Sequence, residues 1–407
     1  MSKNQGTFIE VNLNSLQHNF NFIKSIISEK TKVLAVVKAY AYGTEPSKIA
    51  SFLEKLKVDY FAVAYTSEAV KLRQAGIKKP ILVFHPQPEN LSTIIKHNLI
   101  PTLYCFKILE LFKEILSTKK NKNYPVHLKI NTGLNRIGFN SKEISELIDS
   151  INQDNFIKID GVYSHLSSSE DKLEFDFTQK QISLFTKSVT KIIKNISDKP
   201  IVHLCNTSGI INFPEAHFDM VRCGIGLYGF SNKLTKNKNL IPVVSLKSSI
   251  SQIHFINKGD SVGYNRGYIT ETNKKIGTIP LGHADGISRL YGNNNGFVFI
   301  KNKKAPIIGN VCMDMLMVDI SKINCEEGDE VIIFNEKHSA EQLAESVGTI
   351  SYELLTALSQ RIERKFKILS RIILLSGSIS AIGIILVAPF IGIYAMFIII
   401  PLSALLT

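Results

Sequence analysis

Short apolar runs recur between residues 30 and 230 and alternate with amphipathic segments. Unbroken apolar runs are typical of strands that are buried on both faces of a parallel sheet. The segments between them, such as PSKIASFLEKL and TQKQISLFTKSVTKII, have apolar residues at three- and four-residue spacing and predict helices. The strands that this pattern predicts are 33–37, 60–64, 81–84, 101–105, 126–130, 161–165, 201–205 and 219–223.

Eight strands that alternate with helices predict a (β/α)8 TIM barrel, which we place at residues 7–235. An open doubly wound sheet is the alternative, although no G-x-G-x-x-G segment follows an early strand. After residue 240 the pattern changes to short strands and turns, as in GFVFI and DEVIIF, which predicts a mostly β domain at 236–366. We expect the boundary in the lysine-rich stretch 231–240, and one closing helix at 339–362.

The C-terminal tail differs from the rest of the chain, because residues 372–407 contain no charged side chain. One membrane helix needs about 20 apolar residues, so the tail is long enough to span. Because Pro389 interrupts the apolar run, the tail could form either a single span near 380–400 or a hairpin that bends near Pro389. Basic residues just before the tail favour the cytoplasmic side. We therefore predict cytoplasmic catalytic domains anchored to the inner membrane by a transmembrane tail. A buried helix pair and the remnant of a fused gene are the alternatives.

The charge and the cysteine content of the chain limit which binding partners and metal sites we expect. The 407 residues carry a net charge of +13, but the basic residues are spread along the chain and form no nucleic-acid motif. We therefore expect no nucleic-acid partner. The 5 cysteines include no CxxC pair, which argues against a zinc site or a disulfide framework and favours a reducing compartment. No metal is expected.

Polar side chains follow most of the predicted strands, where a barrel places its chemistry. They are Lys38, His85, Arg136, His165, Asn206, Thr207, Ser208 and Arg222. Burial at a strand end lowers the pKa of a lysine and makes it a nucleophile for a Schiff base. The loops NTSG and CGIG follow the seventh and eighth strands, where barrels often bind phosphate. A reactive lysine beside a phosphate site favours pyridoxal phosphate, with a phosphosugar aldolase-type lysine as the alternative.

The chain resembles the pyridoxal-phosphate-dependent alanine racemases of fold-type III. The resemblance covers about residues 7–365, and the motifs occur in family order. They are VVKAYAYG (36–43), HLKINTGLNRIGF (127–139), VYSHLSSSE (162–170), HLCNTSG (203–209), VRCGIGLYG (221–229), SVGYNRGY (261–268), IPLGHADG (279–286), GNVCMDMLMVD (309–319), GDEV (328–331) and GTISYELL (348–355). The resemblance implies an isomerase that interconverts L-alanine and D-alanine and supplies D-alanine for peptidoglycan of the cell wall. A racemase for serine or a basic amino acid, and a catalytically impaired membrane-attached homologue, are the alternatives.

The resemblance also implies the roles of individual residues. Lys38 would hold pyridoxal 5'-phosphate and act as the base on one face of the substrate. Tyr264 of the partner subunit in a head-to-tail homodimer would act on the other face. The phosphate ligands would be Tyr42, Thr207, Gly224, Ile225 and Tyr352. His165 would stack on the pyridine ring of the cofactor, and Arg222 would contact the ring nitrogen. Arg136 and the backbone N–H of Met313 would bind the substrate carboxylate.

Five positions depart from the usual family motifs and bear on substrate preference. The family usually reads KANAYGHG where this chain has Tyr40, Thr44 and Glu45. Asn131 replaces the usual aspartate, and His283 replaces a tyrosine near the substrate entrance. In some members a lysine that matches Lys129 is carbamylated and orients the arginine that matches Arg136.

Overall fold

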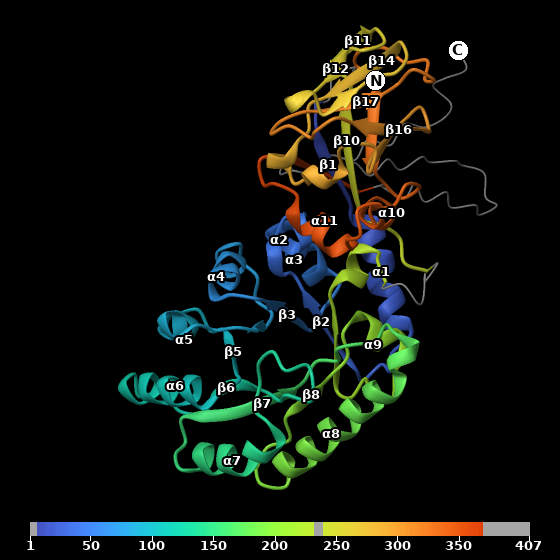
Figure 1. Ribbon diagram of the computed structural model, residues 1–407. Helices are drawn as coiled ribbons and strands as arrows, with labels where there is room; N and C mark the ends of the chain where they lie inside the picture. The colour runs from blue at the N-terminus through green and yellow to red at the C-terminus, as the bar shows by residue number, and fades with distance from the viewer. Residues whose placement is uncertain (1–5, 232–238, 369–407) are drawn as a thin grey trace, which may run out of the picture.

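The computed structural model describes residues 6–231 and 239–368 and shows two lobes. The lower lobe in Figure 1 contains a closed barrel of eight parallel strands, which confirms the predicted TIM barrel. Its strands are β2 (Lys32–Val36), β3 (Tyr60–Val63), β4 (Ile81–Val83), β5 (Ile100–Leu103), β6 (Tyr124–Lys129), β7 (Ile157–Tyr163), β8 (Ile201–His203) and β9 (Met220–Cys223). Each lies on one of the eight apolar runs, and β9 closes the barrel by pairing with β2.

Helices surround the barrel because each places an apolar face on the strands, as Ile49, Ala50 and Leu53 show for α3. They are α1 (Leu13–Ser25), α3 (Pro46–Lys55), α4 (Thr66–Gln74), α5 (Leu91–Lys96), α6 (Phe106–Thr118), α7 (Ile144–Asn152), α8 (Phe175–Ile193) and α9 (Thr207–Asn212). The short helical turn α2 (Lys38–Gly43) lies directly after β2, on the side of the barrel that faces the upper lobe.

The upper lobe is mostly β, as predicted, and is built around a nine-stranded sheet. In spatial order its strands are β11 (Gln252–Ile256), β14 (Lys274–Ile279), β17 (Leu316–Asp319), β16 (Lys303–Ile308), β15 (Phe297–Ile300), β18 (Glu330–Phe334), β10 (Val244–Ser249), β1 (Phe8–Asn12) and β19 (Glu363–Lys367). A separate two-stranded ribbon consists of β12 (Ser261–Val262) and β13 (Tyr268–Ile269).

The first described strand, β1, lies in the upper lobe rather than in the barrel. The predicted barrel unit starts at residue 7, but β1 pairs antiparallel with β10 and parallel with β19. From Ile9 to Asn12 its residues alternate between buried and half-buried positions, which suits a strand in this sheet. The chain therefore crosses into the barrel through α1 and returns to the upper lobe after β9, and this double crossing ties the two lobes together.

The predicted closing helix is divided in two, which corrects the expectation of one helix at 339–362. Helix α10 (Ala340–Glu345) ends before Gly348, whose φ of +74° stops a right-handed helix, and α11 (Ser351–Ala357) begins after it. Most of the predicted boundary stretch at 231–240 and the whole tail at 372–407 lie outside the described residues. Within the part of the chain that the structure describes, no helix is both long and apolar enough to cross a membrane.

Candidate active site

Lys38 lies where β2 ends, at the start of an unusual left-handed turn. The four residues after it, Ala39 to Tyr42, all have φ between 51° and 56°. Each residue of this kind costs about 1–2 kcal/mol, so the turn needs support from its surroundings. Burial lowers the pKa of the Lys38 ammonium group, Arg136 lowers it further, and Glu68 opposes them. The sequence-based expectation of a lysine with a lowered pKa therefore agrees with its environment.

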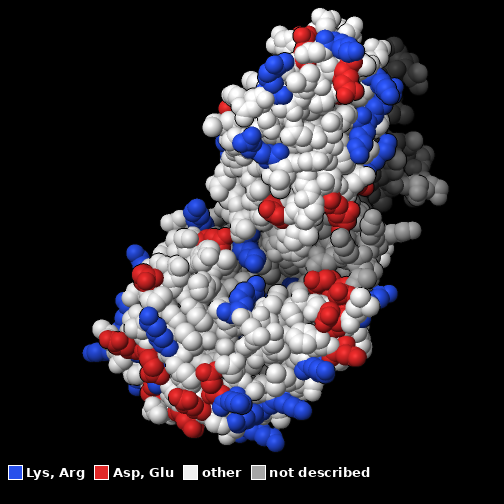
Figure 2. All heavy atoms as spheres, viewed as in Figure 1, with Lys and Arg blue, Asp and Glu red and all other residues white. Residues whose placement is uncertain are grey.

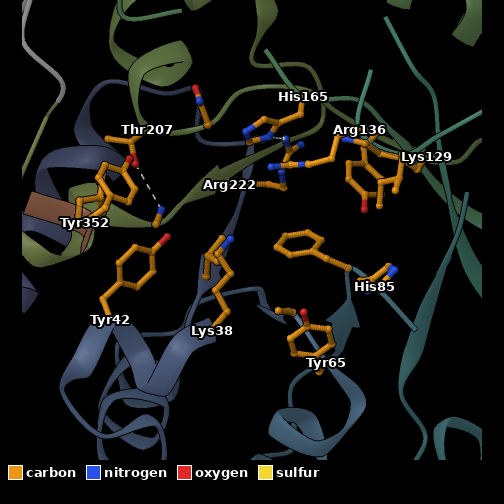
Figure 3. Close-up of a pocket in the computed structure, with 18 residues that line it drawn as sticks. Lys38, Tyr42, Tyr65, His85, Lys129, Arg136, His165, Thr207, Arg222 and Tyr352 are labelled. Carbon is orange, nitrogen blue, oxygen red and sulfur yellow. Dashed lines mark hydrogen bonds between the residues drawn. The ribbon is translucent and has the colours of Figure 1, made fainter. Parts of the chain in front are cut away.

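A cavity of about 540 Å³ opens at the carboxyl ends of the barrel strands, with Lys38 near its centre (Figure 3). Its polar and charged lining includes nearly all the residues that the sequence placed at strand ends. They are Lys38, His85, Arg136, His165, Asn206, Thr207 and Arg222, joined by Lys129, Tyr42 and Tyr352. The volume suits a cofactor-sized molecule. Figure 2 shows Lys and Arg side chains on the left of the hollow between the two lobes and Asp and Glu side chains on its right.

At one end of the cavity Tyr42, Thr207 and Tyr352 form a small polar cup (Figure 3), which also includes Gly224. The Thr207 hydroxyl accepts hydrogen bonds from the backbone N–H groups of Gly224 and Gly226, at 3.4 and 3.2 Å. A Cβ atom at Gly224 would overlap the Tyr42 hydroxyl, so only glycine leaves this space open. Tyrosine and threonine hydroxyls with nearby backbone N–H groups are suitable ligands for a phosphate.

Arg222 forms the floor of the cavity and is 3% exposed. Its guanidinium group donates to the carbonyls of Ser164 and Leu204, at 2.8 and 2.9 Å, and to Nδ1 of His165 and of His203, both at 3.1 Å. Burial lowers the pKa of Arg222 to about 10, so it stays protonated at neutral pH. Burial, and then neighbouring cations, hold the pKa of His165 and of His203 well below the usual value, so both rings are neutral.

A second group of residues lies on the side of the cavity away from the cup. Lys129 is buried with its Nζ 4.5 Å above the Tyr163 ring. Burial, followed by Arg222 and Arg136, holds its pKa well below the ordinary lysine value. His85 contacts the rings of Tyr65 and Tyr104, with centroids 5.9 and 5.4 Å apart.

The sequence reasoning missed some lining residues, of which Tyr163 is the clearest case. Its ring stacks on His203 at 4.7 Å. Tyr163 is two residues before His165, and alternate residues of a strand point to the same face. The strand GVYSH therefore contained the signal that both side chains enter the barrel.

Tyr264 and Met313 are not part of this cavity. Tyr264 lies in the upper lobe after β12 and is 69% exposed, and Met313 is 59% exposed. Both line a separate groove of about 750 Å³, together with Phe255 and Cys312. Within the described residues, Tyr264 and Met313 therefore lie in one groove and Lys38 lies in a different cavity.

Four of the departures from the family motifs stabilise loops and do not line the cavity. The Arg364 guanidinium lies over the Tyr40 ring, 5.3 Å from its centroid. Thr44 donates to the Ala41 carbonyl, and Glu45 caps α3 by accepting from two backbone N–H groups. Asn131 accepts from the backbone N–H groups of the loop that follows β6. The fifth departure, His283, is exposed and donates its backbone N–H to Cys312, beside Met313.

Comparisons with known proteins agree in both lobes. The model for the alanine racemase N-terminal domain matches residues 11–232, and that for the C-terminal domain matches residues 243–366. Alanine racemase 1 of Caldanaerobacter subterraneus is 37% identical over 371 residues, which cover 88% of this chain and 94% of that protein. The solved alanine racemase of Clostridium difficile 630 has a TM-score of 0.83 at 34% identity and covers 89% and 96% of the two chains. That of Bartonella henselae, with covalently bound pyridoxal phosphate, has a TM-score of 0.80 at 26% identity and covers 89% and 100%.

Proposed function

Because this chain belongs to the alanine racemase family, we propose that it interconverts L-alanine and D-alanine with pyridoxal phosphate. The observation that carries this proposal is the arrangement of Lys38 between a phosphate-sized cup and a buried arginine in one cavity. The enzyme is thus a pyridoxal-phosphate-dependent isomerase. We further propose that its D-alanine supplies peptidoglycan synthesis.

The residues present fit the cofactor. When bound, pyridoxal phosphate supplies an aldehyde that reacts with amines and a conjugated ring that acidifies the α-proton of an attached amino acid. Tyr42, Thr207 and Tyr352, with the backbone at Gly224 and Ile225, would bind its phosphate, and Lys38 would hold it covalently. The open space at Gly224 supports this assignment, because a side chain there would fill the cup.

Arg222 would face the ring nitrogen. A guanidinium group has only N–H donors, so the group opposite it has to accept a hydrogen bond. Within the described residues, Arg222 donates to two carbonyls and two imidazoles and to no carboxylate. The ring nitrogen would therefore stay unprotonated, which limits how far negative charge moves into the ring and disfavours side reactions such as transamination. His165 would stack on the ring, and Arg136 would bind the substrate carboxylate.

Racemisation needs a base on each face of the α-carbon, so that one removes a proton and the other returns one. The lowered pKa of Lys38 suits it for this exchange on one face. We propose that Tyr264 of a partner subunit serves the other face in a head-to-tail homodimer. The exposure of Tyr264 and Met313, and the separate groove that they line, support this proposal. The anchoring role of residues 372–407 stays a prediction, which fractionation of the full-length protein without detergent tests.

The decisive experiment combines a substrate panel with subunit mixing. The purified enzyme is expected to racemise alanine much faster than serine or basic amino acids, and only with pyridoxal phosphate. Lys38→Ala and Tyr264→Phe variants should each be inactive in the L-to-D direction. When the two are unfolded, mixed equally and refolded, half of the dimers are mixed and each of these has one intact site, so activity should recover to about a quarter of the wild-type value. No recovery would contradict the shared site, and a preference for another amino acid would contradict the substrate.

A further inference from the structure

Glu68 is a charged residue close to Lys38 that the proposed chemistry does not use. It is the third residue of α4, half-buried between the end of β3 and the turn that follows Lys38. One carboxylate oxygen, Oε2, accepts the backbone N–H groups of Ala64 and Tyr65, at 2.8 and 3.1 Å. An acidic residue at this helix position commonly accepts the N–H of the residue that begins the helix. Helix capping therefore accounts for Oε2 alone.

The other oxygen of Glu68 makes a contact that capping does not require. Its Oε1 accepts the backbone N–H of Ala39 at 2.7 Å, and Ala39 directly follows Lys38. Ala39 is also the first of the four consecutive left-handed residues. The carboxylate thus holds the start of this costly turn from one side. From the other side, Arg364 donates to the Gly43 carbonyl at 3.1 and 3.2 Å, where the turn ends.

The same contact holds a carboxylate at the residue after Lys38, close enough to raise the pKa of an amine that also faces cationic groups. The groups that face Lys38 across the cavity are Arg136 after β6, His165 after β7 and Arg222 on β9, with the tyrosines Tyr42 and Tyr65 on its own side and His85 after β4. Among the charged groups of the described residues that act on the pKa of Lys38, Glu68 alone raises it, whereas burial and Arg136 lower it. A base that also has to return a proton cannot remain permanently neutral.

We propose that Glu68 is a positioning residue for Lys38, which fixes the start of the left-handed turn and keeps the lysine able to gain as well as lose a proton. This inference rests on the proposed function, because it assumes that Lys38 exchanges a proton with substrate. It concerns the amine itself, however, so it can be tested without turnover.

The test compares Glu68→Gln with a matched control. Glu54→Gln is suitable because the Glu54 Oε1 atom also accepts two backbone N–H groups, those of Lys78 and Lys79, both at 2.9 Å, and Glu54 does not act on Lys38. Each full-length variant is stripped of cofactor and exposed to trace acetic anhydride at a series of pH values. The acetylated fraction of Lys38 is measured by mass spectrometry of its peptide. The midpoint of the pH profile gives the pKa of the amine, whereas the plateau at high pH gives its accessibility.

We expect the midpoint for Glu68→Gln to move to lower pH, with acetylation at pH 7 increasing about tenfold for each unit of that shift. Glu54→Gln should keep the wild-type midpoint. An unchanged or higher midpoint in Glu68→Gln would overturn the inference, even if the plateau or the melting temperature changed, because Glu68 would then be only a helix cap. If Glu68→Gln does not fold, Glu68→Asp is used, since a shorter side chain withdraws the carboxylate from Ala39. Because the charge remains, a smaller shift to lower pH is expected, and a midpoint at or above the wild-type value would overturn the inference. Neither result depends on racemase activity, so a failure of the proposed function is recognised separately by the absence of racemisation.

Discussion

Replacing Gly224 with alanine tests whether the cup between Tyr42 and Thr207 binds the cofactor phosphate. The new Cβ atom would overlap the Tyr42 hydroxyl and lie 3.3 Å from the carbon that bears it. The Tyr42 ring is 5% exposed and packs against Tyr228 and Tyr352, with ring centroids 4.7 and 6.0 Å away. It therefore has little room to move except into the cup itself.

This geometry sets the expected magnitude. Without cofactor, Tyr42 relieves the overlap by shifting into the cup, and phosphate binding then forces it back against the added methyl group. Overpacking of a well-packed site typically costs about 1–3 kcal/mol. If that cost falls on the bound state, the dissociation constant for pyridoxal phosphate should rise by about fivefold to 150-fold. The melting temperature of the cofactor-free protein should change much less.

The assay is a titration of cofactor-free protein with pyridoxal phosphate, followed by the absorbance of the bound cofactor. Gly277→Ala in β14 is the control, because the nearest atom to its added Cβ lies at an ordinary 3.4 Å. Tyr42→Phe removes the overlapping hydroxyl, so Gly224→Ala should cost clearly less in that background than in the wild type. Equal costs in the two backgrounds, or wild-type affinity of Gly224→Ala, would refute the assignment of the cup.

Three further predictions follow from other buried contacts. Gly161→Ala places a Cβ 2.5 Å from the fully buried His127 ring and should lower the free energy of unfolding by about 1–3 kcal/mol, measured by urea denaturation. Burial raises the pKa of the Asp319 carboxyl, but its hydrogen bonds, including the one from Lys274, make the net shift a lowering. Ionised Asp319 therefore stabilises the folded protein above the pKa of the unfolded state, and this contribution is lost as the pH falls through the pKa of the folded state. Asp319→Asn should accordingly reduce stability by a constant amount above about pH 5 and by progressively less below about pH 4, and a constant deficit at all pH values would contradict this. Because burial lowers the pKa of Lys129, its amine is neutral and should react with carbon dioxide to form a carbamate. Added bicarbonate should therefore raise turnover, and ¹³C-labelled bicarbonate should give a carbamate NMR signal that is missing in Lys129→Met.

The barrel was predictable because its strands are buried on both faces, so each reads as an unbroken apolar run. The ends of parallel strands meet at one rim, which is why Lys38 and Arg222 were expected together although they are far apart in sequence. Strand β1 was not predictable in this way. Its residues, FIEVN, mix buried and half-buried positions, and nothing in that pattern shows that β10 and β19 are its partners. The two-part closing helix was missed because Gly348 breaks the helix only through its positive φ.

Side-chain contacts across elements were the least accessible part of the site. Glu68 was not identified from the sequence, and its contact with Ala39 depends on the left-handed turn. No residue from Ala39 to Tyr42 predicts that turn. None of these four residues is a glycine, which is the residue expected at positive φ. Local propensity therefore opposes this turn, and contacts from Glu68 and Arg364 hold it.

The separation of the two proposed bases has a consequence for how activity depends on assembly. Lys38 and its cup are complete within one chain, whereas Tyr264 lies on the exposed surface of the other lobe and lines a different groove. Cofactor binding should therefore survive dissociation into single chains, because every proposed cofactor ligand belongs to the same chain, with Tyr352 on α11 and the others in the barrel. Racemisation should not survive, since a single chain offers a base on only one face of the α-carbon. Dilution in the presence of excess cofactor should lower the specific activity while leaving cofactor occupancy constant, and a parallel loss of both would place the proposed subunit contact at the cofactor cup as well.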